Sequence, residues 1–353
     1  MAVKQVNPNV VVQPAAHNWA TETTQGPALQ FHQSLPGYAP TKLIDVPQLA
    51  QELGLGKVLV KDESARFGLP AFKALGATWA IDKALRALSA GPDAVLVTAT
   101  DGNHGRAVAR TAKLRGLAAR IYIPDGVSDF AIQAIADEGA QVTRINGDYD
   151  LAVAAAAKDA EETGALLIQD TAWDGYEEVP SWIVEGYSTM VAEVDQQLAQ
   201  QGLAADLVIV PTGVGSLLQA VIAHYRGQLA GAKVVSVEPD TAGGVFESLK
   251  AGQLVSVATK TTIMTGLNCG TPSSLAMPYI LQGLSGSLLV DDREARAALA
   301  HLTELGVKVG PCGAAALSGI RTLMASDAKT ELGLNEDSVV VLLSTESAEA
   351  NPI

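Results

Sequence analysis

The chain has 353 residues, of which 48% are hydrophobic, and its formal net charge at pH 7 is −14. This length accommodates two domains with substantial cores, and the acidic charge argues against nucleic acid or an anionic membrane as the main partner. No apolar run reaches the roughly 18 to 20 residues that span a bilayer, and the N-terminus lacks the compact apolar core of a secretory signal. We therefore expect a cytoplasmic protein.

After an N-terminal arm for which we expect no regular structure, strands and helices alternate along the chain. In chain order, the pattern predicts a strand at 58–61, a helix at 72–88, a strand at 94–98, a helix at 102–114, a strand at 120–124, a helix beginning near Ser128, a strand at 141–145, an alanine-rich helix around 152–160, a strand at 166–169, a helix at 180–200, and strands at 207–210, 234–237 and 339–343. The last three strands are continuous apolar runs, which is typical of parallel strands buried on both faces. We therefore expect an α/β fold with two open, twisted, mainly parallel sheets and flanking helices.

Two sheets fit a chain of two domains. We expect a small domain at residues 90–188, inserted in a large cofactor-binding domain built from residues 1–89 and 189–353. Ligands of open α/β sheets bind beyond the carboxyl ends of the strands. Polar residues and glycines gather at these ends, namely Asp101-Gly102-Asn103, Asp170, Thr212 to Ser216, Glu238 and Ser344-Thr345. We expect the functional site there.

Lys73 lies between an aromatic residue and small residues, where a lysine can be desolvated and become nucleophilic. By itself it also fits a solvated lysine near a helix start. Gly76 and Ala77 would let a bulky ligand pack closely. The turn at 98–105 follows a strand and opens a helix, so its unpaired N–H groups face an anion. A lysine and an anion cradle together predict a Schiff base with pyridoxal phosphate.

A second glycine turn follows the strand at 207–210. Gly213 and Gly215 let the backbone approach a phosphate, and Ser216 adds a hydroxyl at a helix start. A rival interpretation is a dinucleotide fingerprint, in which Glu238 binds ribose hydroxyls. Leu218 occupies the third glycine position of that motif and is too large for it. The interpretation as an ordinary tight turn without a ligand also stays open.

Four polar residues are candidates for the chemistry. Asp101 lies beside a turn that binds an anion, where a carboxylate does not help anion binding. Its role could be to pair with a cation or to take a proton from the substrate, and it could also be a helix N-cap. Asp170 ends a strand and fits either proton transfer or a turn. Asn103 could hold a cofactor phenolate oxygen or make a local turn bond. His104 fits a supporting residue better than a catalyst.

The last predicted strand ends in Ser344 and Thr345. Neutral hydroxyls at this position would leave a cofactor ring nitrogen largely unprotonated. Such a ring is a poorer electron sink, which favours prompt loss of a β-leaving group.

The two cysteines, Cys269 and Cys312, have neither metal-ligand spacing nor a disulfide framework. We expect two buried thiols in a reducing compartment and no metal site. The sequence leaves their redox state open.

Several segments resemble one enzyme family. Residues 71–77 are similar to the lysine segment of the tryptophan-synthase-like (fold type II) pyridoxal phosphate enzymes, and residues 100–105 to the glycine–asparagine loop of its threonine and serine dehydratases. Within that family, residues 61–77, 98–109, 169–187 and 262–272 more closely resemble the diaminopropionate ammonia-lyase branch. Cys312 stands where we would expect a serine or a similar polar residue.

The resemblance implies a tryptophan synthase β-like fold and a homodimer. It implies that the cofactor is held by Lys73, Phe72, Asn103 (at its hydroxyl), Gly213, Val214, Gly215 and Ser216 (at its phosphate), and Ser344 or Thr345 (at its ring nitrogen). Asp101 and Asp170 would be the acid–base residues, and either of them or the freed Lys73 would remove the α-proton. The substrate would be bound by Thr100, Asp101, Gly102, Asn103, His104 and Asp170. The implied reaction is α,β-elimination of 2,3-diaminopropionate to pyruvate and ammonia.

Three alternatives stay open. A dehydratase or racemase acting on a β-hydroxy amino acid such as serine or threonine would share the fold and the cofactor. A nicotinamide-dependent oxidoreductase is supported only by Gly213, Gly215 and Glu238. A binding protein without catalytic activity is the third, and Lys73 with two placed aspartates argues against it.

Overall fold

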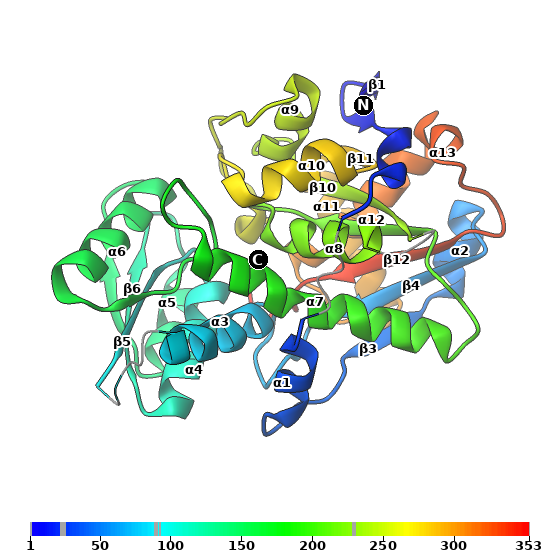
Figure 1. Cartoon of the computed structure of the whole chain (residues 1–353). Helices are drawn as coiled ribbons and strands as arrows, with labels where there is room; N and C mark the ends of the chain where they lie inside the picture. Colours follow the sequence, from blue (N-terminus) through cyan, green and yellow to red (C-terminus); the bar gives the residue numbers. More distant parts are fainter. Residues whose placement is uncertain (1, 22–25, 88–90, 92, 228–230, 353) are drawn as a thin grey trace.

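The computed structural model describes residues 2–21, 26–87, 91, 93–227 and 231–352. Its strands form two sheets flanked by helices (Figure 1). The larger sheet has the order β1-β2-β11-β10-β9-β12-β4-β3, and the smaller has the order β7-β6-β5-β8. All strand pairs of the smaller sheet are parallel, and so are those that join β11, β10, β9, β12 and β4. The prediction of two open, mainly parallel sheets is confirmed.

The strands of the larger sheet come from both ends of the chain. They are β1 (Lys4–Asn7), β2 (Val10–Val12), β3 (Lys42–Asp45), β4 (Lys57–Asp62), β9 (Leu207–Pro211), β10 (Lys233–Pro239), β11 (Gly286–Val290) and β12 (Val339–Ser344). The smaller sheet contains β5 (Val95–Ala99), β6 (Ala118–Ile123), β7 (Gln141–Arg144) and β8 (Leu166–Leu167). Each predicted strand overlaps one of these, and the ends differ by a few residues.

Helices of the described chain cover both sheets. They are α1 (Ala28–Ser34), α2 (Pro47–Leu53), α3 (Ala74–Ala87), α4 (Asn103–Arg115), α5 (Asp129–Ala136), α6 (Tyr149–Thr163), α7 (Glu178–Ala199), α8 (Ser216–Arg226), α9 (Gly244–Ala251), α10 (Met277–Gly283), α11 (Asp292–Glu304), α12 (Pro311–Met324) and α13 (Ala328–Glu331). Ser128 caps α5 as predicted, because its side chain accepts from the N–H of Ala131. Leu88, the predicted end of α3, lies outside the described residues. None of the described helices is long and apolar enough to cross a membrane.

The expectation of an irregular N-terminal arm was wrong. Strand β2 pairs antiparallel with both β1 and β11, so the arm extends the larger sheet at one edge. Val10, Val11 and Val12 are almost completely buried there. Strand β3 is antiparallel to β4 at the opposite edge. Antiparallel strands therefore close both edges of a parallel centre.

Helices α3 and α7 approach each other at glycines. A Cβ at Gly76 would lie 2.6 Å from the ring of Tyr187, and a Cβ at Gly186 would lie 2.6 Å from the carbonyl oxygen of Leu75. The expectation that Gly76 makes room for a ligand was therefore wrong, since it makes room for α7. This close crossing fixes the start of α3, directly after Lys73.

Figure 1 shows the smaller sheet on the left, the larger sheet on the right, and α7 running across between them. The strands of the smaller sheet fall between Val95 and Leu167. Helix α7 continues through residues 188 and 189, where we set the end of the small domain. The domain limits of 1–89 with 189–353 and 90–188 stay a prediction.

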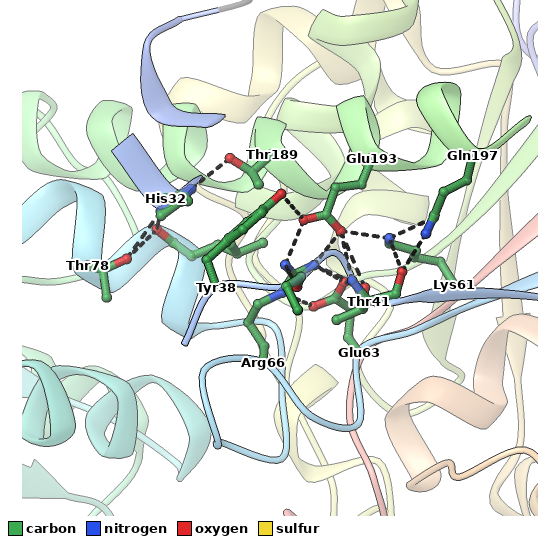
Figure 2. A network of polar contacts seen from close by, with 12 residues as sticks. His32, Tyr38, Thr41, Lys61, Glu63, Arg66, Thr78, Thr189, Glu193 and Gln197 are labelled. Carbon is green, nitrogen blue, oxygen red and sulfur yellow. Dashed lines mark hydrogen bonds and ion pairs between the residues drawn. The ribbon is translucent and has the colours of Figure 1, made fainter. Parts of the chain in front are cut away.

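A buried network of charges anchors the segment that leads from β4 to α3 (Figure 2). Glu193 of α7 accepts from Lys61 Nζ and from Arg66 Nη1, both at 2.7 Å. Arg66 also donates to Glu63 at 2.6 and 2.9 Å. All four side chains are at most 1% exposed. Two cations and two carboxylates thus balance each other inside the protein, where an unpaired charge would be very costly.

The same figure shows His32 of α1 linked to the start of α3 (Figure 2). Burial lowers the pKa of His32 to about 4, so the ring is neutral. The carbonyl oxygen of Leu75 can only accept, so His32 Nε2 donates to it at 3.0 Å, and Nδ1 accepts from the Thr189 hydroxyl at 2.7 Å. Lys73 therefore lies between two fixed segments. The loop after β4 is held by the buried charge network, and the first turn of α3 is held by His32.

Candidate active site

A cavity lies where the carboxyl ends of strands from both sheets meet. Its wall combines residues that follow β5, β8, β9 and β12 with the start of α3. Of the predicted site residues, it brings together Phe72, Lys73, Thr100, Asp101, Asn103, His104, Asp170, Gly213, Val214, Gly215, Ser216 and Thr345. Gly102 and Ser344 do not line this cavity. Most of the residues predicted to meet beyond the strand ends therefore share one cavity, and their roles stay a prediction.

The amine of Lys73 pairs with Asp170. Lys73 Nζ donates to Asp170 Oδ2 at 2.6 Å, and the two side chains are 21% and 5% exposed. Burial opposes the charge on Lys73, yet the charge of Asp170 and this hydrogen bond raise the pKa of the amine above its usual value. Burial likewise opposes the charge on Asp170, but His104 and Lys73 lower the pKa of that carboxyl to about 2. Asp170 is therefore ionised at neutral pH.

Asp101 has a different electrostatic environment. Burial and the charge of Asp170 raise its pKa to about 6, while the charge of Lys73 opposes the shift. A carboxyl with a pKa near 6 gives and takes protons close to neutral pH, which suits a general acid or base. The two aspartates of one cavity therefore differ in pKa and can play different roles.

The side chains of His104, Tyr149 and Gln169 lie beside Asp170, and Gln169 Nε2 is 3.5 Å from Asp170 Oδ1. His104 Nε2 donates to the carbonyl oxygen of Ile168 at 2.7 Å, and its Nδ1 lies 3.8 Å from Asp170 Oδ2. The Tyr149 hydroxyl lies 3.4 Å from Asp170 Oδ1 and accepts from Gln169 Nε2 at 2.8 Å. Burial lowers the pKa of His104, so its ring is neutral at neutral pH. This geometry suits a supporting residue, as predicted for His104.

The turn before α8 forms a cradle of backbone N–H groups. Those of Gly213, Val214 and Gly215 have no hydrogen-bond partner in the described chain, and α8 starts at Ser216. Gly215 has φ +97°, which favours glycine, and a Cβ at Gly213 would lie 3.0 Å from the carbonyl oxygen of Gly266. Ser216 Oγ donates to the carbonyl oxygen of Asp170 at 2.6 Å. Such a cradle at a helix N-terminus suits a phosphate group.

The turn before α4 is shaped by a hydroxyl. Thr100 Oγ1 accepts from the N–H groups of Gly102 and Gly105 at 2.9 and 3.0 Å. Gly102 has φ +154° and lines an adjoining cavity together with Asp101 and Lys260. The hydroxyl of Thr100 therefore organises the turn that presents Asp101 and Asn103.

The end of β12 offers two unused hydroxyls. Ser344 Oγ and Thr345 Oγ1 are buried and have no hydrogen-bond partner in the described part of the chain. Thr345 lines the cavity, whereas Ser344 Oγ would lie 2.9 Å from a Cβ at Gly313 and so faces α12. Unpaired buried hydroxyls at a cavity are suited to a ligand that is not part of the chain.

Sequence reasoning missed two side chains of this site. Tyr149, the first residue of α6, reaches Asp170. Glu346 lines the cavity, is 2% exposed and accepts from Asn103 Nδ2 at 2.7 Å. Tyr149 follows a turn, and Glu346 follows the end of β12. These positions in the sequence were the available signal that the two residues could belong to the site. The two thiols also line the cavity, and burial raises the pKa of both. Cys312 is buried as expected, whereas Cys269 is only partly buried, so the expectation of two buried thiols was wrong for Cys269.

The dinucleotide interpretation fails at Glu238. Its two carboxylate oxygens accept from the N–H groups of Val245 and Phe246, both at 2.8 Å, at the start of α9. The side chain is 1% exposed and does not line the cavity. Glu238 caps a helix and is not available to ribose hydroxyls.

The chain matches the family described as "Pyridoxal-phosphate dependent enzyme" over residues 35–346. The chain belongs to this family. The diaminopropionate ammonia-lyase of Salmonella typhimurium is 37% identical, with 90% of this chain and 87% of the relative covered. The Escherichia coli diaminopropionate ammonia-lyase has been solved with D-serine and with an aminoacrylate-PLP azomethine reaction intermediate. Each of these two structures has a TM-score of 0.89 and 30% sequence identity to this chain, and each match covers 99% of this chain. The match covers 95% of the D-serine complex and 96% of the aminoacrylate complex.

This pyridoxal-phosphate-dependent enzyme therefore belongs to the same branch as these relatives, as the resemblance implied. The N–H groups of residues 213–215, which have no partner among the described residues, fit the cofactor's phosphate, and the unpaired hydroxyl of Thr345 fits its ring nitrogen. The Ser344 hydroxyl faces α12 instead, which argues against the predicted contact of Ser344 with the ring nitrogen. Among the described residues, Lys73 is the only lysine that lines the cavity. The residues present thus fit the cofactor, although the role of each one stays a prediction.

Proposed function

We propose that this enzyme catalyses the pyridoxal-phosphate-dependent α,β-elimination of 2,3-diaminopropionate to pyruvate and ammonia. The observation that carries the proposal is the pair of carboxylates, Asp101 and Asp170, that share one cavity with Lys73. A substrate with two amino groups brings more positive charge than a β-hydroxy amino acid. The names of the curated relatives support the same reaction.

In this proposal the amine of Lys73 would hold pyridoxal phosphate covalently, and Phe72 would pack beside it. Gly213, Val214, Gly215 and Ser216 would hold the phosphate, Asn103 would hold the ring oxygen, and Thr345 would meet the ring nitrogen. When bound, the cofactor supplies an electron sink for the pair released at the substrate Cα. The N–H groups of the turn from Thr100 to His104 face the substrate carboxylate.

The two aspartates have different roles. Asp101 takes the proton from Cα, because its pKa of about 6 is the closer of the two to neutral pH. Asp170 stays ionised and attracts the β-ammonium group, since opposite charges interact more strongly in a dry cavity than in water. The β-ammonium then leaves as ammonia with the electrons of its bond to carbon, while the pair released at Cα forms a Cα–Cβ double bond. Water hydrolyses the released 2-aminoacrylate to pyruvate and a second ammonia.

A dehydratase or racemase of β-hydroxy amino acids is the second candidate. L-threonine ammonia-lyase of Geobacter sulfurreducens is 28% identical, with 75% of this chain and 62% of the relative covered. A hydroxyl leaving group arrives uncharged and gains nothing from the ionised Asp170. This difference in charge supports the diamino substrate.

Two finer inferences belong to this proposal. We infer a homodimer because the family resemblance implies one, and a cytoplasmic location because the two thiols suit a reducing compartment. Sedimentation of the purified holoenzyme tests the dimer. A mass of one chain would contradict it.

The direct test compares substrates. Pyruvate formation is followed with purified holoenzyme and equal concentrations of 2,3-diaminopropionate, serine and threonine, with 2-oxobutyrate measured for threonine. We expect kcat/KM for diaminopropionate to exceed the others by about 100-fold or more, as expected for loss of a positioned charge partner. Equal or higher rates with serine or threonine would favour the dehydratase.

A further inference from the structure

Glu346 is a buried carboxylate in the active-site wall that the proposed reaction leaves without a role. Its side chain lies 2% exposed, and no lysine, arginine or histidine of the described chain pairs with it. Oε2 accepts from Asn103 Nδ2 at 2.7 Å, and Oε1 accepts from the N–H of Cys312 at 3.3 Å. A carboxyl that is buried without a cation is costly, so its hydrogen bonds determine its state.

The backbone fixes Glu346 in place. Its residue pairs with Ala71 in an isolated bridge, two positions before Lys73, and its carbonyl oxygen accepts from the N–H of Gly310 at 2.8 Å. A Cβ at Gly310 would lie 3.0 Å from Glu346 Oε1. The carboxylate therefore has little freedom to move away from Asn103.

A carboxylate imposes an orientation on an amide. An ionised carboxylate only accepts, whereas an asparagine has one end that donates and one that accepts. Asn103 must therefore turn its NH2 group toward Glu346, which uses one of two hydrogens. The second hydrogen stays available to another acceptor. Burial raises the pKa of Glu346, while the bonds from Cys312 and Asn103 oppose that shift and favour the ionised form.

We propose that Glu346 is a positioning residue that orients the amide of Asn103 so that its second N–H faces the cofactor's ring oxygen. The inference rests on the cofactor-binding role proposed for Asn103 and is independent of which amino acid the enzyme uses. In this proposal Glu346 acts on the cofactor through Asn103.

A double-mutant cycle tests this coupling. Holoenzyme carrying Glu346→Gln, Asn103→Ala or both is dialysed, and the dissociation constant of pyridoxal phosphate is obtained from the loss of its visible band. Glutamine can donate or accept, so it no longer fixes the amide. We expect Glu346→Gln to weaken cofactor binding by about tenfold, or about 1.4 kcal/mol. The double variant should match Asn103→Ala within about twofold, because the two residues act as a unit.

A second variant separates orientation from charge. Glu346→Asp keeps the charge but withdraws it from Asn103, so we expect cofactor binding to weaken by about tenfold, as for Glu346→Gln, and the visible band of both variants to shift by the same amount. Glu238→Gln is the matched control: Glu238 is equally buried and accepts from two N–H groups at a helix start, but it lies outside the cavity. Its cofactor constant and band should be those of the wild type.

Three results would overturn the inference. These are an unchanged cofactor constant in both Glu346 variants, losses that add in the double variant, or no loss in Asn103→Ala. All are read without substrate. An enzyme that shows the coupling but does not act on diaminopropionate would contradict the proposed reaction and leave this inference standing.

Discussion

The environment of Asp101 predicts how kcat/KM falls on the acidic side of the pH profile (the acid limb). Its pKa of about 6 is raised by burial and by Asp170, against the charge of Lys73. A base acts in its ionised form, so kcat/KM for diaminopropionate should fall as the pH drops through 6. A group with a pKa near 6 is about 90% ionised at pH 7 and about 10% at pH 5, which gives a fall of roughly tenfold.

The assay measures initial rates of pyruvate formation by coupled reduction to lactate at pH values from about 5 to 8. Asp101→Asn should lower kcat/KM by about 100-fold and remove the acid limb, since an amide takes no proton. Asp150→Asn is the control, because burial also raises the pKa of Asp150 but the residue does not line the main cavity. An acid limb that persists in Asp101→Asn would refute the assignment of the base.

Two further changes test how the fold supports the site. Glu193→Gln leaves two buried cations facing one carboxylate, so urea unfolding should show a loss of about 3 to 5 kcal/mol, whereas Glu162→Gln in an exposed pair should cost less than about 1 kcal/mol. A loss below about 1 kcal/mol for Glu193→Gln would contradict the interpretation of the network. Gly213→Ala puts a Cβ 3.0 Å from the carbonyl oxygen of Gly266, so dialysis should show cofactor binding at least about tenfold weaker, while Gly91→Ala, with open space around it, should bind normally. Normal binding by Gly213→Ala would argue against a phosphate in this cradle.

The parallel core of the fold could be predicted because its strands are continuous apolar runs. Strands such as β9 and β12 are buried on both faces, and their composition alone marks them. Strand β2 could not be found in this way. It is only Val10–Val12, and it becomes a strand by pairing with β11, which lies at Gly286–Val290. Because β2 depends on a partner that is far away in the sequence, the residues around Val10–Val12 carry no local pattern that predicts a strand.

The site was predictable where a local motif carries the function. Lys73, the glycine turn and the two aspartates each follow a strand or begin a helix, and the cavity brings them together. Glu346 was missed because its meaning depends on Asn103, 243 positions away in sequence. Gly76 was misinterpreted for the same reason, since its partner Tyr187 belongs to a distant helix.

The covalent attachment of the cofactor to Lys73 is the central claim. Freshly purified holoenzyme is reduced with borohydride, digested, and mapped by mass spectrometry, with Lys73→Ala treated in parallel. The account predicts a phosphopyridoxyl group on Lys73, loss of the visible band on reduction, and neither band nor turnover in the variant. A peptide containing an unmodified Lys73, with the label on another lysine or on none, would contradict it.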